Sequence, residues 1–103
     1  MYKLVFFVPG SHLESVKAAV FAAGAGRIGD YDQCCWQIEG QGQFRPLAGA
    51  QPFTGEKEQL SREPEWRVET VCLDDCIGAV RDALIAAHPF EEPAYDIWRL
   101  ADV

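Results

Sequence analysis

The residues of this chain best suited to chemistry lie in one segment near its end, His88-Pro89-Phe90-Glu91-Glu92-Pro93-Ala94-Tyr95-Asp96. One imidazole and three carboxylates fall within nine positions, and divalent metal ions accept both kinds of ligand. The candidate metal ligands of this segment are therefore His88, Glu91, Glu92 and Asp96. The alternative is structural, because a histidine in the last turn of a helix can bond the final carbonyls while glutamates form a solvated turn.

A second motif, Gly24-Ala25-Gly26-Arg27-Ile28-Gly29, matches the dinucleotide-binding fingerprint by letter. That fingerprint follows a strand and opens a helix, so that helix N–H groups meet the pyrophosphate. Here it follows a helical pattern and precedes a strand pattern. We interpret these glycines as helix C-cap and turn residues.

The four cysteines are Cys34, Cys35, Cys72 and Cys76, and no two have CxxC spacing. Adjacent residues on a strand point to opposite faces, so Cys34 and Cys35 are not expected to hold one metal ion together. We interpret the four as small, buried apolar side chains kept reduced in the cytosol. Cys76 is the exception, because it lies near a predicted helix N-terminus, where the helix dipole lowers a thiol pKa.

The elements that must position these residues fall into two similar halves. Branched and aromatic residues predict four strands, and apolar residues at helical spacing predict two helices. The strands are Tyr2–Val8, Tyr31–Glu39, Glu65–Leu73 and Ala94–Leu100. Ser11, in a capping box with Glu14, is the predicted N-cap of the first helix, and Asp74 or Asp75 that of the second.

This order is βαβ–βαβ and predicts an α+β fold, the ferredoxin-like βαββαβ sandwich. Four antiparallel strands would form one sheet with two helices on one face, and residues 1–103 would form a single domain. Strand 2–8 is nevertheless apolar on both faces. We therefore predict a homo-oligomer that covers the helix-free face. The alternative is a monomer whose long loop covers that face.

Residues 40–64 form a long segment with little regular pattern. Segments of this length inside a compact domain are commonly functional or disordered. Glycines, prolines and two phenylalanines recur at short intervals. We interpret the segment as a long hairpin arm with bulges, held by Phe44 and Phe53.

The overall charge excludes some partners. The formal net charge is −7 and the pI about 4.6, without a basic run. Nucleic acid and anionic membrane surfaces are therefore not expected partners. No apolar stretch reaches the roughly 18 residues of a membrane span. The first residues lack the features of a signal peptide, which predicts a cytoplasmic protein. No nucleophile elbow, P-loop or HExxH motif is present, and we expect no enzyme activity.

Spaced glycines and the histidine-containing segment together point to a known family. The residues concerned are Gly24, Ala25, Gly26, Ile28, Gly29, Tyr31, Cys34, Gly40, Gly42, Phe44, Pro46, Gly49, Ala50, Pro52, Gly55, Glu69 and the segment 88–96. In this pattern the chain resembles the insert domain of the Nif-three-like proteins, also called GTP cyclohydrolase 1 type 2 homologues (YqfO in bacteria). That insert is similar to the PII signalling proteins and to the copper-tolerance protein CutA.

The resemblance implies a trimer assembled through the sheet faces. It also implies that the segment 40–64 contacts partners and that small ligands bind in clefts between subunits. Similarity to CutA implies a divalent metal, with His88 and Glu91 as its ligands. The resemblance also implies that full-length relatives hold a metal pair in two flanking domains, which we expect to be absent here. Their hydrolase chemistry is therefore not transferred, and the chain resembles a stand-alone insert.

We therefore predict a non-enzymatic, oligomeric PII/CutA-like module that binds or senses a small ligand or a divalent metal. Phe44 and Arg45 are the predicted ligand-binding residues, and Arg45 could meet an anion. The first alternative is an accessory domain that docks a partner protein through the arm 40–64. A metal-dependent hydrolase is the least favoured alternative.

Overall fold

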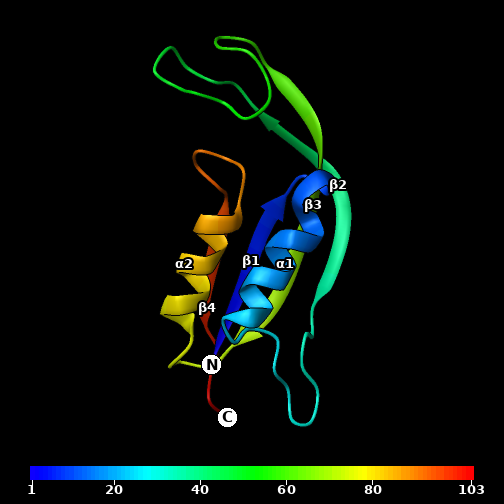
Figure 1. The fold of residues 1–103 in the computed structure, drawn as a ribbon, viewed down its shortest axis with the longest axis vertical. Coiled ribbons are helices and arrows are strands. Elements are labelled where there is room, and N and C mark those ends of the chain that lie inside the picture. Colours follow the sequence, from blue (N-terminus) through cyan, green and yellow to red (C-terminus); the bar gives the residue numbers. More distant parts are fainter.

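The computed structural model describes residues 1–103 and confirms the βαββαβ order (Figure 1). The elements are β1 (Tyr2–Val8), the short 3-10 helix η1 (Gly10–His12), α1 (Leu13–Ala22), β2 (Trp36–Phe44), β3 (Ser61–Cys72), α2 (Ile77–Ala87) and β4 (Tyr95–Arg99). The strands form one antiparallel sheet in the order β2-β3-β1-β4. Both helices lie on the same face of this sheet, as predicted (Figure 1).

The core lies between the helices and the central strand β1. Alternate residues of β1, namely Leu4, Phe6 and Val8, are fully buried against the helices. The helical stripes supply the opposite wall through residues such as Val16 and Leu84. Full burial of a side chain of this size contributes about 1.5–3 kcal/mol to the free energy of unfolding, so this layer is the main stabilising element.

The helix-free face carries the other alternate residues. Val5 lies opposite Glu69 on β3 and Asp96 on β4, and it is fully buried by its neighbours. The exposed apolar side chains of this face come instead from the edge strands. Trp36, Ile38 and Trp98 are 55%, 50% and 47% exposed, and their strand partners place them on the same side as Val5.

The predicted hairpin arm is present, but it is more regular than expected. β2 and β3 pair without interruption from Trp36 opposite Glu69 to Phe44 opposite Ser61. The register is the same at both ends, so the predicted bulges are absent. The two strands extend beyond the rest of the sheet, and the loop 45–60 curves back toward the turn between α2 and β4 (Figure 1).

The second strand begins at Trp36, five positions later than the predicted Tyr31. Gln33 has a positive φ of 54°, and the N–H of Cys34 bonds the carbonyl of Gly26 instead of a neighbouring strand. Gly24 and Gly26, with φ of 120° and 82°, occupy turn conformations that follow α1. Their interpretation as helix-end and turn residues is confirmed.

Both predicted helix caps are wrong. α1 begins after η1 with His12 as its N-cap, and the Ser11 hydroxyl contacts Nδ1 of His12 at 2.8 Å rather than a helix N–H. The N-cap of α2 is Cys76, again without a side-chain cap.

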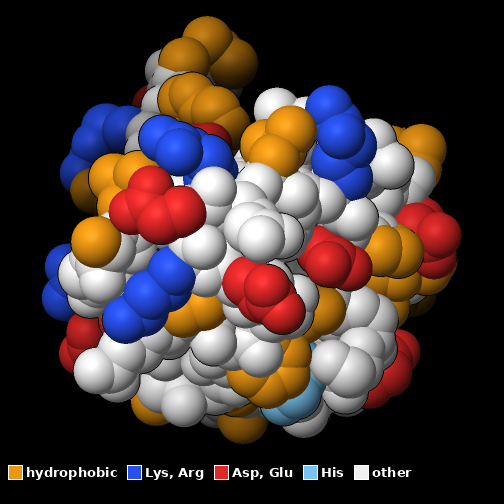
Figure 2. Space-filling view, turned by 90° about the horizontal axis from the view of Figure 1, so that it is seen from above, with side chains coloured by type: hydrophobic (Ala, Val, Ile, Leu, Met, Phe, Trp, Pro, Cys, Tyr) orange, Lys and Arg blue, Asp and Glu red, His pale blue; other side chains and the backbone are white.

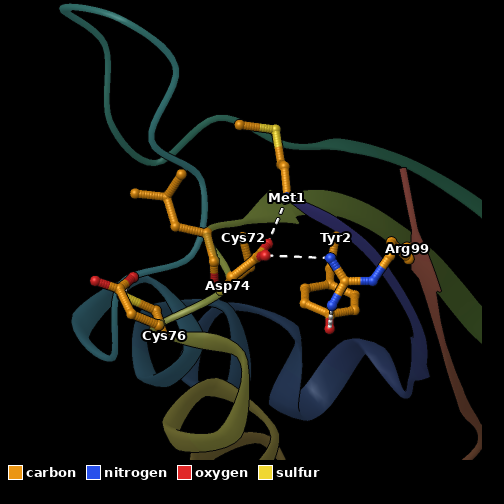
Figure 3. A network of polar contacts seen from close by, with 8 residues as sticks. Met1, Tyr2, Cys72, Asp74, Cys76 and Arg99 are labelled. Carbon is orange, nitrogen blue, oxygen red and sulfur yellow. Dashed lines mark hydrogen bonds and ion pairs between the residues drawn. The ribbon is translucent and has the colours of Figure 1, made fainter. Parts of the chain in front are cut away.

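Asp74 instead belongs to a network of polar contacts with Met1 and Arg99 (Figure 3). It accepts hydrogen bonds from the Met1 amine and from Nη1 of Arg99, the latter at 3.1 Å. These bonds hold the pKa of Asp74 below its ordinary value. The Arg99 guanidinium also lies 4.6 Å from the centre of the Tyr2 ring and bonds its hydroxyl. The contacts join β1, β4 and the turn before α2.

No helix has both the length and the apolar character that crossing a bilayer requires.

Candidate functional site: the arm pocket

A pocket of about 530 Å³ lies between the arm and the turn that joins α2 to β4; we call it the arm pocket. The arm supplies Phe44, Arg45 and Phe53, and the turn supplies Phe90 and Glu91. Phe7, Gly42, Glu65 and Glu92 also line it. Three of the four predicted site residues, Phe44, Arg45 and Glu91, are therefore brought together. The fourth, His88, lies behind Phe90 and does not line the pocket.

Phe90 is the centre of an aromatic cluster that holds the arm against the turn. Its ring centroid lies 6.4 Å from that of Phe44, 6.1 Å from that of Phe53 and 4.9 Å from that of His88. These tilted arrangements are ones that aromatic pairs prefer. Phe53 also meets His12 edge-on at 5.4 Å. The predicted anchoring of the arm by Phe44 and Phe53 is therefore confirmed.

His88 is 7% exposed, and hydrogen bonds occupy both of its ring nitrogens. The N–H of Phe90 donates to Nδ1 at 3.1 Å, so Nε2 carries the proton and donates to the carbonyl of Phe7 at 2.7 Å. Burial of the ring lowers the pKa of His88 below its ordinary value of 6.5, which favours this neutral form. The histidine thus joins the end of α2 to β1 across the molecule.

These bonds bear on the predicted metal site. A metal ion at His88 would have to replace one of the two hydrogen bonds. Glu91 is also engaged, because its carboxylate accepts the N–H of Gln51 at 3.2 and 3.3 Å. The structure has no group of three or more His, Cys, Asp or Glu side chains placed to hold a metal ion. Metal binding by His88 and Glu91 stays a prediction.

Glu65 is the residue of this site that sequence reasoning missed. Its carboxylate lies against Gly42, where an added Cβ would come within 2.5 Å of the carboxyl carbon. Half-buried, it has no hydrogen bond or ion pair, and burial raises its pKa above the ordinary value. The sequence did contain a signal for this residue. Gly40 and Gly42 alternate along β2, and the residues opposite them on β3 are Glu65 and Glu63.

Arg45 is the basic side chain of the arm pocket. Its Nη1 lies 3.6 Å from Oε2 of Glu58, which does not line the pocket.

Seen from above, the molecule shows acidic, basic and apolar side chains intermixed, with no continuous basic area on this face (Figure 2).

The cysteines lie apart from the arm pocket. Cys34 and Cys35 precede β2 instead of lying within it, and both line a second pocket of about 440 Å³ on the helix-free side with Lys3 and Trp36. The prediction that they face opposite ways on a strand is wrong for this reason. A hydrogen bond to Asp75, followed by burial, raises the pKa of the Cys76 thiol, so the predicted lowering at this helix N-terminus is also wrong. All four thiols are free, but only Cys72 is buried and Cys35 is exposed, so the prediction that the cysteines are buried holds for Cys72 alone.

The fold and the arm define a class, the PII/CutA-like α+β modules. The PII-like protein CutA from Nostoc sp. PCC 7120 superposes with a TM-score of 0.68 over 97% of this chain and 81% of its own, at 13% identity. Identity this low shows the shared fold alone. The predicted fold class is confirmed.

Closer similarity leads to one family. A Bacillus cereus protein related to NIF3 has a TM-score of 0.84 at 40% identity, over 98% of this chain and 26% of that one. The GTP cyclohydrolase 1 type 2 homologue of Mycobacterium leprae is 50% identical over 98 residues, which are 95% of this chain and 26% of that protein. The chain is a homologue of the PII/CutA-like domain of the Nif-three-like family, as the resemblance indicated.

The chain spans about a quarter of the length of the curated relatives it matches. No family model matches the chain. The activity of the whole relatives is therefore not a property shown for this domain.

Proposed function

We propose that this chain is a non-catalytic PII/CutA-like module that binds a small ligand in the arm pocket. The observation that supports it is the pocket itself: about 530 Å³, concave, lined by phenylalanines and bordered by a few charged groups. Ligand sites in proteins have this size and this mixture of apolar walls and few polar groups. Phe44 and Arg45 are the proposed ligand-binding residues, because both lie on the arm side of the pocket.

A non-catalytic role is supported by the state of His88. Its ring lies against the pocket-lining Phe90, yet both of its nitrogens are bonded to the backbone and the ring is buried. It is therefore not placed to exchange a proton with a bound molecule. Its contacts indicate that it orients the α2–β4 turn.

We also propose that the module is a homo-oligomer, with a trimer as the predicted state. Trp36 and Ile38 on one edge strand and Trp98 on the other expose apolar area on the helix-free face, and exposed apolar area of this kind is typical of a surface covered by another subunit. A cytoplasmic location is proposed from the four free thiols, because reducing compartments keep cysteines unpaired.

The test of ligand binding is a titration followed by NMR with a library of small molecules that includes nucleotides, amines, carboxylates, zinc and copper. We expect amide shifts concentrated on residues 42–54 and 90–94. Phe44→Ala should abolish them, whereas Ile85→Ala, an exposed change on α2, should preserve them. Shifts confined to other surfaces, or none at millimolar concentration, would refute the pocket as a ligand site and favour docking of a partner protein through the arm.

A further inference from the structure

The geometry of the arm pocket points to a ligand class: we infer that it selects an organic cation, an amine attached to a flat apolar group. This inference rests on the proposed function, since it concerns the same pocket. It goes further by stating which charge and shape the ligand has.

The first step is the charge of the lining. Three carboxylates, of Glu65, Glu91 and Glu92, border the pocket against one guanidinium, that of Arg45. Arg45 is turned to a partner of its own, Glu58, at 3.6 Å, which offsets its charge. An anion entering the pocket would meet an excess of negative charge, and a cation would be attracted.

The second step is the state of Glu65. Its carboxylate is half-buried and has no donor from the protein, and Gly42 leaves the space in which it lies. A carboxylate taken partly out of water without a partner is costly, and burial accordingly raises its pKa. An ammonium group would supply the missing donors and form a charge-assisted hydrogen bond.

The third step is the aromatic wall. Phe44, Phe53 and Phe90 are grouped around one side of the pocket, and Phe7 lines it from the sheet. Aromatic faces attract cations placed within about 6 Å of the ring centre. This molecule already uses that attraction, because the Arg67 guanidinium lies 5.6 Å from the centre of the Phe7 ring. The same wall would stack a flat apolar group.

The experiment compares three probes of one shape and different charge: 2-phenylethylamine, 2-phenylethanol and 3-phenylpropanoate. Each is titrated into the whole chain at neutral pH, and the shifts of pocket amides are followed by NMR. We expect the amine to bind about tenfold more tightly than the alcohol, the factor that corresponds to one charge-assisted contact. The propanoate should bind more weakly than either.

Two variants test the carboxylate. Glu65→Gln should remove the preference for the amine while leaving the affinity for the alcohol unchanged. Gly42→Ala should weaken amine binding with little loss of stability, because the added Cβ displaces only the flexible end of Glu65. The matched control is Glu63→Gln, on the same strand and the same face but outside the pocket lining, which should keep the preference.

The outcomes separate this inference from the proposed function. Equal or tighter binding of the propanoate, or an unchanged amine preference in Glu65→Gln, would overturn the ligand class while leaving the pocket as a ligand site. Absence of pocket shifts with all three probes, and with the nucleotides, carboxylates and metals of the library, would overturn both.

Discussion

The backbone N–H of Gln51 donates to both carboxylate oxygens of Glu91, at 3.3 and 3.2 Å, across 40 positions of sequence. This is the hydrogen bond that joins the arm loop to the α2–β4 turn. Aromatic contacts of Phe90 with Phe44 and Phe53 join the arm to the same turn. The arm is therefore held by a polar contact as well as by the cluster around Phe90.

Replacement of Glu91 should loosen the arm loop. Because Glu91 is exposed, its bond to Gln51 is expected to contribute about 1 kcal/mol or less. In Glu91→Ala, hydrogen exchange of the Gln51 amide should accelerate by up to about fivefold. Glu92→Ala removes a neighbouring carboxylate without this bond and should leave the exchange rate unchanged. Equal acceleration in both variants would contradict the assignment.

The aromatic cluster should contribute unequally to stability. Phe90 is half-buried and contacts three rings, so Phe90→Ala is expected to lower the free energy of unfolding by about 2 kcal/mol, below the range for fully buried phenylalanines. Phe53 is 51% exposed, so Phe53→Ala should lower the free energy of unfolding by less than Phe90→Ala does. Urea unfolding measures both. A larger loss for Phe53→Ala would show that the arm, and not the turn, carries the cluster.

Two adjacent residues of α2 should respond very differently to truncation. Leu84 is fully buried in the core, so Leu84→Ala should lower the free energy of unfolding by about 2–5 kcal/mol. Ile85 is exposed on the outer side of the helix, and Ile85→Ala should change it by about 0.5 kcal/mol or less. Similar losses in thermal or urea unfolding would mean that the face of α2 is wrongly assigned.

Stability should fall in mild acid because of His88. Burial lowers its pKa in the folded state below the ordinary 6.5, so the unfolded chain binds a proton first as the pH decreases. The contribution is fully present above pH 6.5 and is lost as the pH falls from there toward the lower folded pKa. Unfolding followed between pH 7 and 5 should show this slope, and His88→Gln should flatten it. The control variant His12→Gln leaves the buried ring of His88 in place and should keep the slope. If the free energy of unfolding in that variant did not change with pH, the assignment of the slope to His88 would be refuted.

The proposed homo-oligomer should depend on the helix-free face. Trp98→Glu places a charge among the exposed apolar side chains of that face and should reduce the mass in solution to that of one chain. Ile85→Glu introduces the same charge on α2 and should leave the mass unchanged. Sedimentation equilibrium distinguishes them. A native chain that is monomeric at micromolar concentration would rule the oligomer out.

The order of elements and the fold class could be predicted from the sequence because they follow from local periodicity. β1 was predicted with its observed bounds, and Val80 and Leu84, apolar residues at helical spacing in α2, are buried. Element ends were less predictable. Ser11 and Asp74 have the right side chains for helix caps, yet each found another partner, His12 for one and Arg99 with the Met1 amine for the other.

Sequence alone determined which residues are apolar and in which order helices and strands follow one another, and it singled out Phe44, Arg45, His88 and Glu91. Only the tertiary structure decided which groups these residues contact. It placed His88 behind Phe90 with its nitrogens bonded, and it brought Glu65 over Gly42 as an unpaired carboxylate. The physical reason is that periodicity is a property of neighbours along the chain. Burial and hydrogen-bond pairing depend instead on contacts between the arm and a turn some 40 positions away.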